Sequence, residues 1–304
     1  MPLVTAKNLV KRYGSFTVLD GVDFEINHGV TGLLGANGTG KTTILGMIIG
    51  LHPTDKGELR VLGNDPWSAG SQVRERLGYS PEHHTLPPDL RAADFVRHVA
   101  ELHGLPRAEA TTRASDALWL VGLGEERFRP MGTMSTGQRQ RVKLAQAIAH
   151  DPKLVLLDEP TDGLDPVQRD SMLELISQVA SEFEIDVILS SHLLDEVEAI
   201  CDDVVIIGDG VTLAAGSLDE LRSTDAIGVE LELDATPQEI DRVVETLRSR
   251  GFDASATGRR VVVDGMDDTI FDFARDACAD VGVGVVRLRR RRHTLEEVFL
   301  GKLR

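Results

Sequence analysis

Residues 35–42 are the part of this chain best suited to do chemistry. They read Gly-Ala-Asn-Gly-Thr-Gly-Lys-Thr and match the pattern G-x-x-x-x-G-K-[ST], a loop that cradles nucleotide phosphates. Glycine permits backbone conformations that turn several N–H groups toward one point, and a following helix adds the positive end of its dipole there. Lys41 can then reach the outer phosphates, and the Thr42 hydroxyl can bind Mg²⁺. The predicted nucleotide-binding residues of this loop are Gly35, Asn37, Gly38, Thr39, Gly40, Lys41, Thr42 and Thr43.

Two acidic residues follow a second apolar run. Residues 154–157 read as a buried strand of a parallel sheet, and Asp158 and Glu159 come directly after them. Because ligands of α/β sheets bind outside the carboxyl ends of the strands, these acids are expected at the same crevice as the loop. Asp158 is expected to hold Mg²⁺, and Glu159 to orient or deprotonate an attacking water. The alternative is a strand that simply ends in solvated acids.

A further candidate anion site begins a predicted helix at Ser135-Thr136-Gly137-Gln138. A hydroxyl, backbone N–H groups and the helix dipole converge there, although serine is also favoured as an ordinary helix cap. The run resembles the signature of the ATP-binding cassette (ABC) family, usually written LSGGQ. The resemblance implies that Ser135, Thr136, Gly137 and Gln138 contact ATP.

Other marks of that family follow in the family's order. Tyr13 matches the aromatic residue that stacks on adenine, with a core tyrosine as the alternative. Asp165, in Gly-Leu-Asp at 163–165, matches the loop through which two cassettes communicate, with a simple turn as the alternative. His192 matches the switch histidine that senses the γ-phosphate, and the alternative is a histidine that caps a loop. The resemblance covers about residues 3–217.

The chain departs from the family pattern at three positions. Ala36 stands where proline is usual, and Thr136 replaces a signature glycine, which adds a Cβ near the phosphate of the opposing subunit. Glu82 occupies the position of the glutamine that contacts Mg²⁺ and the attacking water. A carboxylate can still bind Mg²⁺, which prefers oxygen ligands, but it adds negative charge beside a triphosphate. Glu82 is therefore predicted as a metal ligand together with Thr42 and Asp158.

The elements that must position these residues belong to an α/β fold. An apolar strand at 30–34 and an apolar helix at 43–49 flank the phosphate loop, which is the setting of a P-loop NTPase core. An inserted helical subdomain is expected at about 85–150, where Ala92, Val96, Val99 and Leu102 recur at helical spacing. The expected domains are an ABC ATP-binding domain at 1–217 and an accessory domain at 218–304.

Residues 226–288 predict the order strand, helix, strand, strand, helix, strand. This order favours a small α+β domain of the ferredoxin-like type, a fold that hosts many functions. A final helix is expected at 294–300, and this ending resembles the tails of ATPases paired with type-2 exporters, a branch that includes drug and antibiotic efflux systems. Arg287 and residues 289–292 form a basic cluster, which favours a solvated strand edge over a subunit or lipid contact.

Composition limits the function classes. The chain has 304 residues and a formal net charge of −16, which argues against binding nucleic acid through its general field. Its two cysteines suit a reducing cytosol. No apolar run approaches the roughly 18 residues that a membrane span needs, so a membrane role is expected through a partner.

The resemblance thus implies an ATP-hydrolysing subunit of a membrane exporter, with ATP and Mg²⁺ as cofactors. Two copies are expected to form a head-to-tail homodimer on a multi-span transmembrane permease, at the cytosolic face of the membrane, with no nucleic-acid partner. One alternative is a soluble mechanical ATPase acting on nucleic acid or ribosomes, whose members usually carry two cassettes or a long coiled coil. Another is a regulatory module that binds ATP without turnover, which Glu159 and His192 argue against.

Overall fold

The computed structural model describes residues 2–82, 86–223, 228–264 and 269–291 of the chain. Its internal contacts divide it into two compact units, Met1–Leu218 and Asp219–Arg304, which are described separately below. Each unit has buried hydrophobic clusters of its own, two in the first and one in the second. The expected helix at 294–300 and residue 292 of the basic cluster lie outside the described residues.

The first unit is built on a six-stranded sheet whose strands run parallel except for the antiparallel edge strand. In spatial order these strands are β5 (Leu77–Ser80), β6 (Leu154–Asp158), β7 (Asp186–Ser191), β3 (Val30–Leu34), β8 (Asp203–Gly208) and β9 (Val211–Ser217). All five residues of β3 and all five of β6 are buried, as expected for parallel strands covered on both faces. The carboxyl ends of β3, β6 and β7 therefore meet at one edge of the sheet, next to one another.

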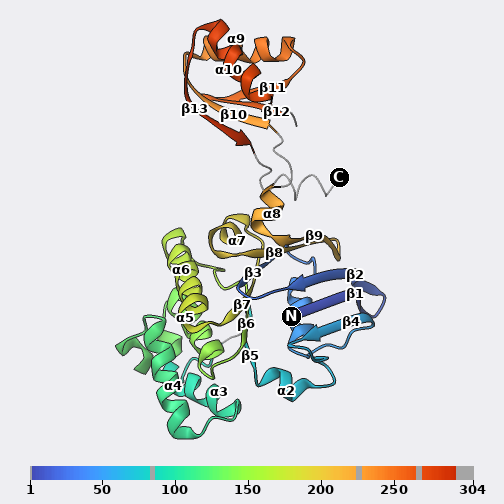
Figure 1. The fold of residues 1–304 in the computed structure, drawn as a ribbon. Helices are drawn as coiled ribbons and strands as arrows, with labels where there is room; N and C mark the ends of the chain where they lie inside the picture. The colour runs from blue at the N-terminus through green and yellow to red at the C-terminus, as the bar shows by residue number, and fades with distance from the viewer. Residues whose placement is uncertain (1, 83–85, 224–227, 265–268, 292–304) are drawn as a thin grey trace. The chain divides into compact units, whose positions relative to one another are not determined.

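A three-stranded antiparallel sheet lies beside the six-stranded one (Figure 1). Its strands, in spatial order, are β2 (Phe16–Ile26), β1 (Val4–Tyr13) and β4 (Lys56–Val61). Helix α1 (Lys41–Ile48) packs between the sheets, since Ile44 and Met47 share a buried cluster with Phe24 of β2 and Leu156 of β6. The short helix α2 (Gly70–Arg74) precedes β5.

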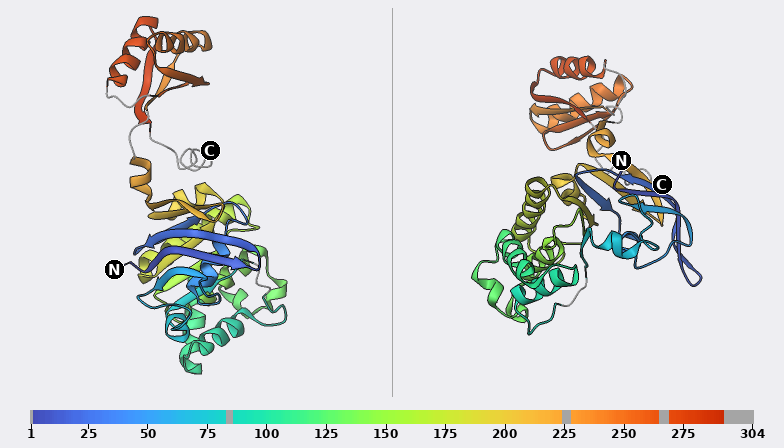
Figure 2. Two further views of the ribbon diagram at one scale, coloured as in Figure 1. Left: turned by 90° about the vertical axis from the view of Figure 1, so that its right-hand side faces the viewer. Right: turned by 60° about the horizontal axis from the view of Figure 1, so that its bottom comes forward.

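Helices gather on the side of the six-stranded sheet away from β1, β2 and β4, as the right-hand view of Figure 2 shows. They are α3 (Ala92–Leu102), α4 (Arg107–Leu120), the 3₁₀ turns Glu125–Phe128 and Met131–Thr133, α5 (Thr136–Ile148), α6 (Pro166–Phe183) and α7 (Leu194–Ile200). Most of the helices that fall within residues 85–150 pack into one buried cluster with α6.

The predicted apolar stripe of α3 is partly wrong. Ala92 and Val96 are fully buried, but the stripe continues through Ala100, and Leu102 is 73% exposed. At about 100° per residue, Leu102 lies about 120° around the helix from the centre of the buried stripe. From Val96, a spacing of three or four residues allows the stripe to continue either to Ala100, as observed, or through Val99 to Leu102, as predicted. The spacing alone does not say which of these two faces is buried.

The second unit is a four-stranded antiparallel sheet with two helices. In spatial order the strands are β11 (Asp253–Thr257), β12 (Arg260–Asp264), β10 (Gly228–Asp234) and β13 (Gly284–Arg291). Helices α9 (Pro237–Ser249) and α10 (Ile270–Val281) pack on the face that presents Leu231 of β10, and α8 (Leu218–Ser223) precedes this sheet in the chain. On β10, Glu230 points away from that core and pairs with Arg289 of the edge strand β13 at 2.8 Å. This pair accounts for one arginine of the basic cluster.

Candidate functional site

The phosphate loop connects β3 to α1. Gly40 is the N-cap of α1 with φ 105°, and Gly38 has φ 86°, both in the left-handed region that favours glycine. No side chain caps α1, and its first turn contains no acidic residue. The first backbone N–H groups of this helix are thus left to an external acceptor, which suits an anion such as phosphate.

Lys41 is held inside the loop that contains it. Its Nζ donates to the carbonyl oxygens of Gly35 and Ala36 at 2.6 and 3.3 Å, and the side chain is only 6% exposed. The loop closes tightly at Gly35, where an added Cβ would lie 2.5 Å from the carbonyl oxygen of Ile207. Thr39 closes the same loop, because its hydroxyl donates to the Ala36 carbonyl at 2.9 Å. Gly35 and Thr39 therefore shape the loop that presents Lys41.

Asp158, at the end of β6, is buried and oriented by a neighbouring strand. Ser190 of β7 donates its hydroxyl to Asp158 Oδ1 at 2.6 Å and accepts the backbone N–H of Glu159 at 3.1 Å. The other carboxylate oxygen, Oδ2, is buried without a hydrogen-bond partner among the described residues. A buried, unpartnered carboxylate oxygen is costly and is well matched to a bound cation.

Glu159 is fixed at both carboxylate oxygens. Oε1 lies 3.2 Å from Lys41 Nζ, an ion-pair distance without the angles of a hydrogen bond, and Oε2 lies 2.9 Å from His192 Nδ1. Its backbone has φ 47°, an uncommon conformation for a residue with a side chain, of the kind found at functional sites. His192 is itself 39% exposed in its side chain, so it can meet a ligand as well as Glu159. His192 thus contacts the candidate base and also faces solvent, an arrangement that its predicted role requires.

A cavity of about 360 Å³ opens next to these groups. Glu82 and Glu159 line it, as does Val18 of β2. The predicted loop residues that line it are Asn37, Gly38, Gly40, Lys41, Thr42 and Thr43. The structure thus brings the phosphate loop, the candidate base and two candidate metal ligands, Thr42 and Glu82, to the same space.

The donor set around this cavity fits Mg²⁺. Thr42 offers a hydroxyl and Glu82 a carboxylate at the cavity, and Asp158 has the unpartnered buried oxygen. Hard oxygen donors of this kind, with few ligands from the protein, suit an ion that keeps waters and phosphate oxygens as its other ligands.

The signature residues lie apart from that cavity and do not line it. Ser135 caps α5 in a reciprocal capping box with Gln138, with hydrogen bonds of 3.2 and 3.1 Å. The Thr136 hydroxyl accepts a hydrogen bond from Arg139 at 3.2 Å. Gly137 packs closely against α6, since a Cβ added to it would lie 3.2 Å from Gln168 Oε1.

Asp165 lies beside the signature loop and begins α6. It accepts the backbone N–H of Gln168 at 2.9 Å, so its observed role is that of an N-cap. A Cβ added to Gly163 would lie 3.4 Å from Thr136 Cγ2, which places the 163–165 loop against the signature. Within one copy these two segments form a surface separate from the cavity around Lys41.

Tyr13 is not a core tyrosine, because it is 45% exposed. It lies at the end of β1, edge-on to His52 with 5.8 Å between the ring centroids. It does not line the cavity around Lys41. Its position on an exposed surface leaves a face of the ring accessible to a stacking partner.

Sequence reasoning missed a buried carboxylate, Glu196 of α7, that connects the segment after β6, the end of β7 and helix α6. Glu196 is 1% exposed and accepts the hydroxyls of Thr161 and Ser191, each at 2.6 Å. Arg169 of α6 lies 3.3 Å from the same carboxylate. Because Thr161 follows Glu159 closely and Ser191 precedes His192, this network fixes the two segments that carry the candidate catalytic pair. Sequence reasoning also missed Ser190. The feature that could have indicated it is the pair of small polar residues, Ser190 and Ser191, at the end of an apolar strand.

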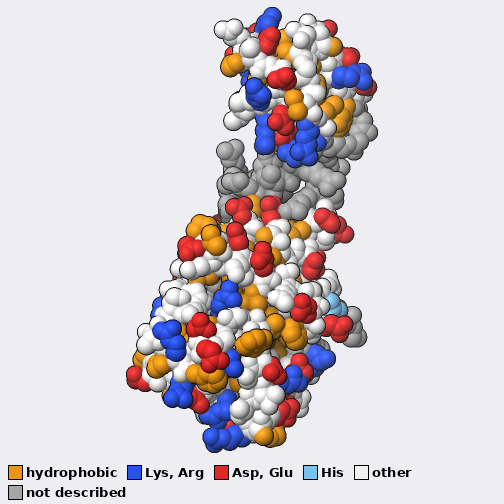
Figure 3. Space-filling view, turned by 90° about the vertical axis from the view of Figure 1, so that its left-hand side faces the viewer, with side chains coloured by type: hydrophobic (Ala, Val, Ile, Leu, Met, Phe, Trp, Pro, Cys, Tyr) orange, Lys and Arg blue, Asp and Glu red, His pale blue; other side chains and the backbone are white. Residues whose placement is uncertain are grey.

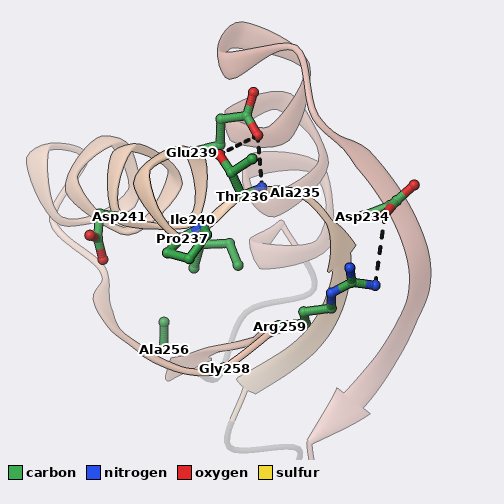
Figure 4. Close-up of a pocket in the computed structure, with 10 residues that line it drawn as sticks. All are labelled: Asp234, Ala235, Thr236, Pro237, Glu239, Ile240, Asp241, Ala256, Gly258 and Arg259. Atoms are coloured by element: carbon green, nitrogen blue, oxygen red, sulfur yellow. Dashed lines mark hydrogen bonds and ion pairs between the residues drawn. The ribbon is translucent and has the colours of Figure 1, made fainter.

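A larger cavity, of about 680 Å³, lies in the second unit near the start of α9 (Figure 4). Four of the polar residues that line it, Asp234, Thr236, Glu239 and Arg259, have partners within the unit. Arg259 lies 3.8 Å from Asp234, and Glu239 accepts the backbone N–H and the hydroxyl of Thr236 in a capping box. None of the predicted site residues lies there, so volume is a poor guide to the chemistry in this chain.

Comparison with known proteins gives a consistent answer. The sequence profile of the family described as ABC transporter matches residues 19–162. The "Linearmycin resistance ATP-binding protein LnrL" of Bacillus subtilis (strain 168) is 36% identical over 222 residues, which cover 73% of this chain and 71% of that protein. The "Nod factor export ATP-binding protein I" of Cupriavidus metallidurans is 31% identical over 303 residues, covering 98% of this chain and 96% of that protein.

Solved structures agree with the sequence relatives. One titled "Structure of ATP binding subunit of ABC transporter" matches with a TM-score of 0.64 and 30% identity, over 73% of this chain and 92% of that one. A second, of cbiO1 from Clostridium perfringens, matches with a TM-score of 0.66 and 25% identity, over 82% and 97%. Both matches fit a P-loop core of the cassette type. The chain therefore belongs to the ABC transporter family, as an ATP-binding subunit of the kind that hydrolyses ATP to power transport.

Proposed function

We propose that this chain powers a membrane exporter by closing, in two copies, head to tail around two ATP molecules. The observation that carries the proposal is the separation of two half-sites within one copy. Lys41, Thr42 and Glu159 share a cavity that none of the signature residues lines. In a head-to-tail pair, each ATP would lie between Lys41 of one copy and Ser135 and Gly137 of the other.

Each group of the first half-site has a definable task in hydrolysis. Lys41 would exchange its loop carbonyls for phosphate oxygens, which leaves its charge beside the transferring phosphoryl group. Glu159 would orient or deprotonate the attacking water, and His192 would hold the carboxylate and meet the γ-phosphate end of ATP. Thr42, Asp158 and Glu82 would hold Mg²⁺, which supplies positive charge to the phosphates. Tyr13 would stack on the base.

The second half-site makes closure depend on nucleotide. The capped N-terminus of α5 and the adjacent Asp165 loop would contact the ATP held by the other copy, an interaction absent after hydrolysis. A ligand that binds only the closed pair shifts the population toward closure, and loss of its γ-phosphate reverses the shift. That difference is the power stroke we propose.

Export is supported by relatives that extend beyond the cassette. A protein named for Fe(3+) import in Photobacterium profundum is 36% identical, but over only 73% of this chain. Identity within the cassette therefore does not indicate direction. The match to the Nod factor export protein covers 98% of this chain, so it includes the second unit. The relatives named for linearmycin resistance and bacitracin transport cover 73% and 76% of this chain, much as the import protein does, so it is the longer match that supports export.

A multi-span permease is the partner that this function requires. None of the helices within the described residues is long and apolar enough to cross a bilayer. We place the chain at the cytosolic face of the membrane, bound through its permease, because the relatives it matches are named as ATP-binding proteins of transport and resistance systems. For the second unit we propose the ferredoxin-like class, which its element order and strand order β11-β12-β10-β13 support.

A mechanical ATPase on nucleic acid or ribosomes is the less favoured alternative. The matched relatives are named for transport, export or resistance, and the net charge of −16 opposes attraction to phosphate backbones. On the face drawn in Figure 3, acidic and basic side chains of the described residues are interspersed, and they form no continuous basic surface.

Purification from detergent-solubilised membranes separates the two functions. The tagged chain should bring down a multi-span membrane protein, and the complex should hydrolyse ATP faster than a Lys41→Met complex purified in the same way. Recovery of the chain with ribosomes or nucleic acid, and with no multi-span protein, would contradict the exporter proposal.

A further inference from the structure

The helix that carries the signature also buries a lysine that the proposed hydrolysis does not use. Lys143 of α5 is 6% exposed, and its Nζ donates to the backbone carbonyl of Glu82 at 2.8 Å. It borders a cavity of about 280 Å³ whose walls include the apolar side chains of Leu86 and Met131. A buried ammonium with apolar neighbours is costly unless nearby groups compensate it.

The compensating groups are carboxylates of the nucleotide site. Burial lowers the pKa of Lys143, while the charges of Glu82, Asp158 and Asp162, in that order, raise it. The pKa of Tyr79 is raised to about 12, chiefly by burial and then by Asp158 and Glu82. Glu82 and Asp158, both predicted metal ligands, thus lie close enough to Tyr79 and Lys143 to act on both side chains. The hydrogen bond from Lys143 Nζ to the Glu82 carbonyl places the ammonium next to a residue that lines the nucleotide cavity.

The negative charges of Glu82 and Asp158 oppose the binding of ATP, because its phosphates are also negatively charged. Lys41 faces the carboxylate of Glu159 and the carbonyls of its own loop, so its charge is already shared. A carboxylate at position 82, where the family usually has a neutral amide, adds one more negative charge next to the phosphates. Charges a few ångströms apart at low dielectric interact strongly, so this addition must be offset for ATP to bind.

We infer that Lys143 is a positioning residue that offsets the negative charge of Glu82 and anchors its backbone to α5, so that ATP can bind beside a carboxylate. This inference rests on the proposed function, because it needs the nucleotide at the cavity around Lys41. Lys143 and Glu82 form a matched pair in this chain, joined by the hydrogen bond from Lys143 Nζ to the Glu82 carbonyl. The pair also links residue 82 to the helix that begins at Ser135, so the two half-sites of one copy are mechanically joined.

A double-mutant cycle on ATP binding tests the pairing. The four proteins are the parent, Lys143→Met, Glu82→Gln and the double variant, titrated with ATP in a calorimeter, once with EDTA and once with Mg²⁺. We expect Lys143→Met to weaken ATP binding about tenfold when Glu82 is present and at most about twofold in the Glu82→Gln background. The difference should be larger in EDTA, where the added cation is missing.

Matched controls separate charge from packing. Lys153→Met removes the same charge from an exposed lysine and should leave ATP affinity within about twofold in both backgrounds. Lys143→Arg keeps the charge and should retain most of the affinity. Lys143→Gln keeps a hydrogen-bond donor without the charge, so it should behave like Lys143→Met. If Lys143→Met shows no cooperative thermal unfolding transition, Lys143→Gln takes its place in the cycle.

Two results would overturn the inference, and they differ from each other. If the parent binds ATP and Lys143→Met weakens binding equally in both backgrounds, Lys143 acts independently of Glu82 and the inference is wrong. If the parent shows no ATP binding at all, the proposed function fails and the inference fails with it.

Discussion

His192 Nδ1 lies 2.9 Å from Glu159 Oε2, on the side of the carboxylate opposite Lys41. The two residues come from the ends of different strands, β6 and β7, which are neighbours in the parallel sheet. With Lys41 Nζ 3.2 Å from Oε1, the carboxylate is held between two cationic or donor groups and cannot turn freely. A base held in this way needs little reorganisation when a water is placed before it.

Replacement of His192 by alanine should slow hydrolysis and leave nucleotide binding largely intact. We expect ATP turnover to fall by roughly 10²–10³-fold, since both the orientation of Glu159 and a contact to the γ-phosphate are lost. ATP affinity should change by less than about threefold, because the phosphate loop is unaltered. Phosphate release and calorimetric titration measure the two effects. His98→Ala, an exposed histidine of α3, should change neither, and an equal loss in both variants would contradict the assigned role.

Ser190→Ala tests how the two acids are held. Its hydroxyl is the donor to Asp158 Oδ1 and the acceptor for the Glu159 backbone, both in a buried setting. Loss of a buried partner should lower the free energy of unfolding by about 1–3 kcal/mol, measured by urea denaturation. Because Asp158 is then less well oriented, the Mg²⁺ concentration for half-maximal ATPase activity should rise. Ser181→Ala, at an exposed serine of α6, should cost less than about 0.5 kcal/mol. Equal stability losses would argue against the linking role of Ser190.

Glu82→Gln should keep ATPase activity and change its metal dependence. A neutral amide removes one charge from the cavity and is a weaker ligand for a hard cation than a carboxylate. The Mg²⁺ concentration for half-maximal activity should therefore rise. Superimposable Mg²⁺ titrations of the variant and the parent would show that the carboxylate does not contribute to the metal site.

Acid should destabilise the chain partly through His150. Burial, followed by the charge of the stacked His103, lowers the pKa of His150 to about 4. In the unfolded chain the ordinary value of 6.5 applies, so between those values the unfolded state binds the extra proton. Stability should therefore fall as the pH drops from about 6.5 to 4, by roughly 3 kcal/mol at most from this residue.

A comparison with His150→Gln isolates this effect from the titration of acidic groups. Glutamine can still donate to the carbonyl of Leu77, which His150 Nε2 contacts at 2.9 Å, but it does not titrate. The variant should lose less stability than the parent over the same pH interval, as followed by denaturant unfolding at each pH. Parallel curves for the two proteins would contradict a lowered pKa at His150.

Motifs with a fixed local geometry could be predicted from the sequence, whereas contacts across the fold could not. Strand, glycine loop and helix are contiguous, so the placement of Lys41 follows from residues 30–49 alone. No local pattern marks Ser190, Glu196 or Lys143. Each of them forms a hydrogen bond to a residue of another segment, 31 to 61 positions away in the sequence. The α3 stripe failed for a related reason, because which face packs is decided by the neighbouring helices rather than by the spacing itself.

The most direct test of the account is the oligomeric state of Glu159→Gln with ATP. Without the carboxylate, ATP should bind and persist, so the protein should elute as a dimer in size-exclusion chromatography with light scattering at saturating ATP and Mg²⁺. The same variant without nucleotide, or combined with Ser135→Arg at the opposing half-site, should elute as a monomer. If Glu159→Gln stays monomeric while calorimetry shows that it is saturated with ATP, the head-to-tail sandwich is wrong.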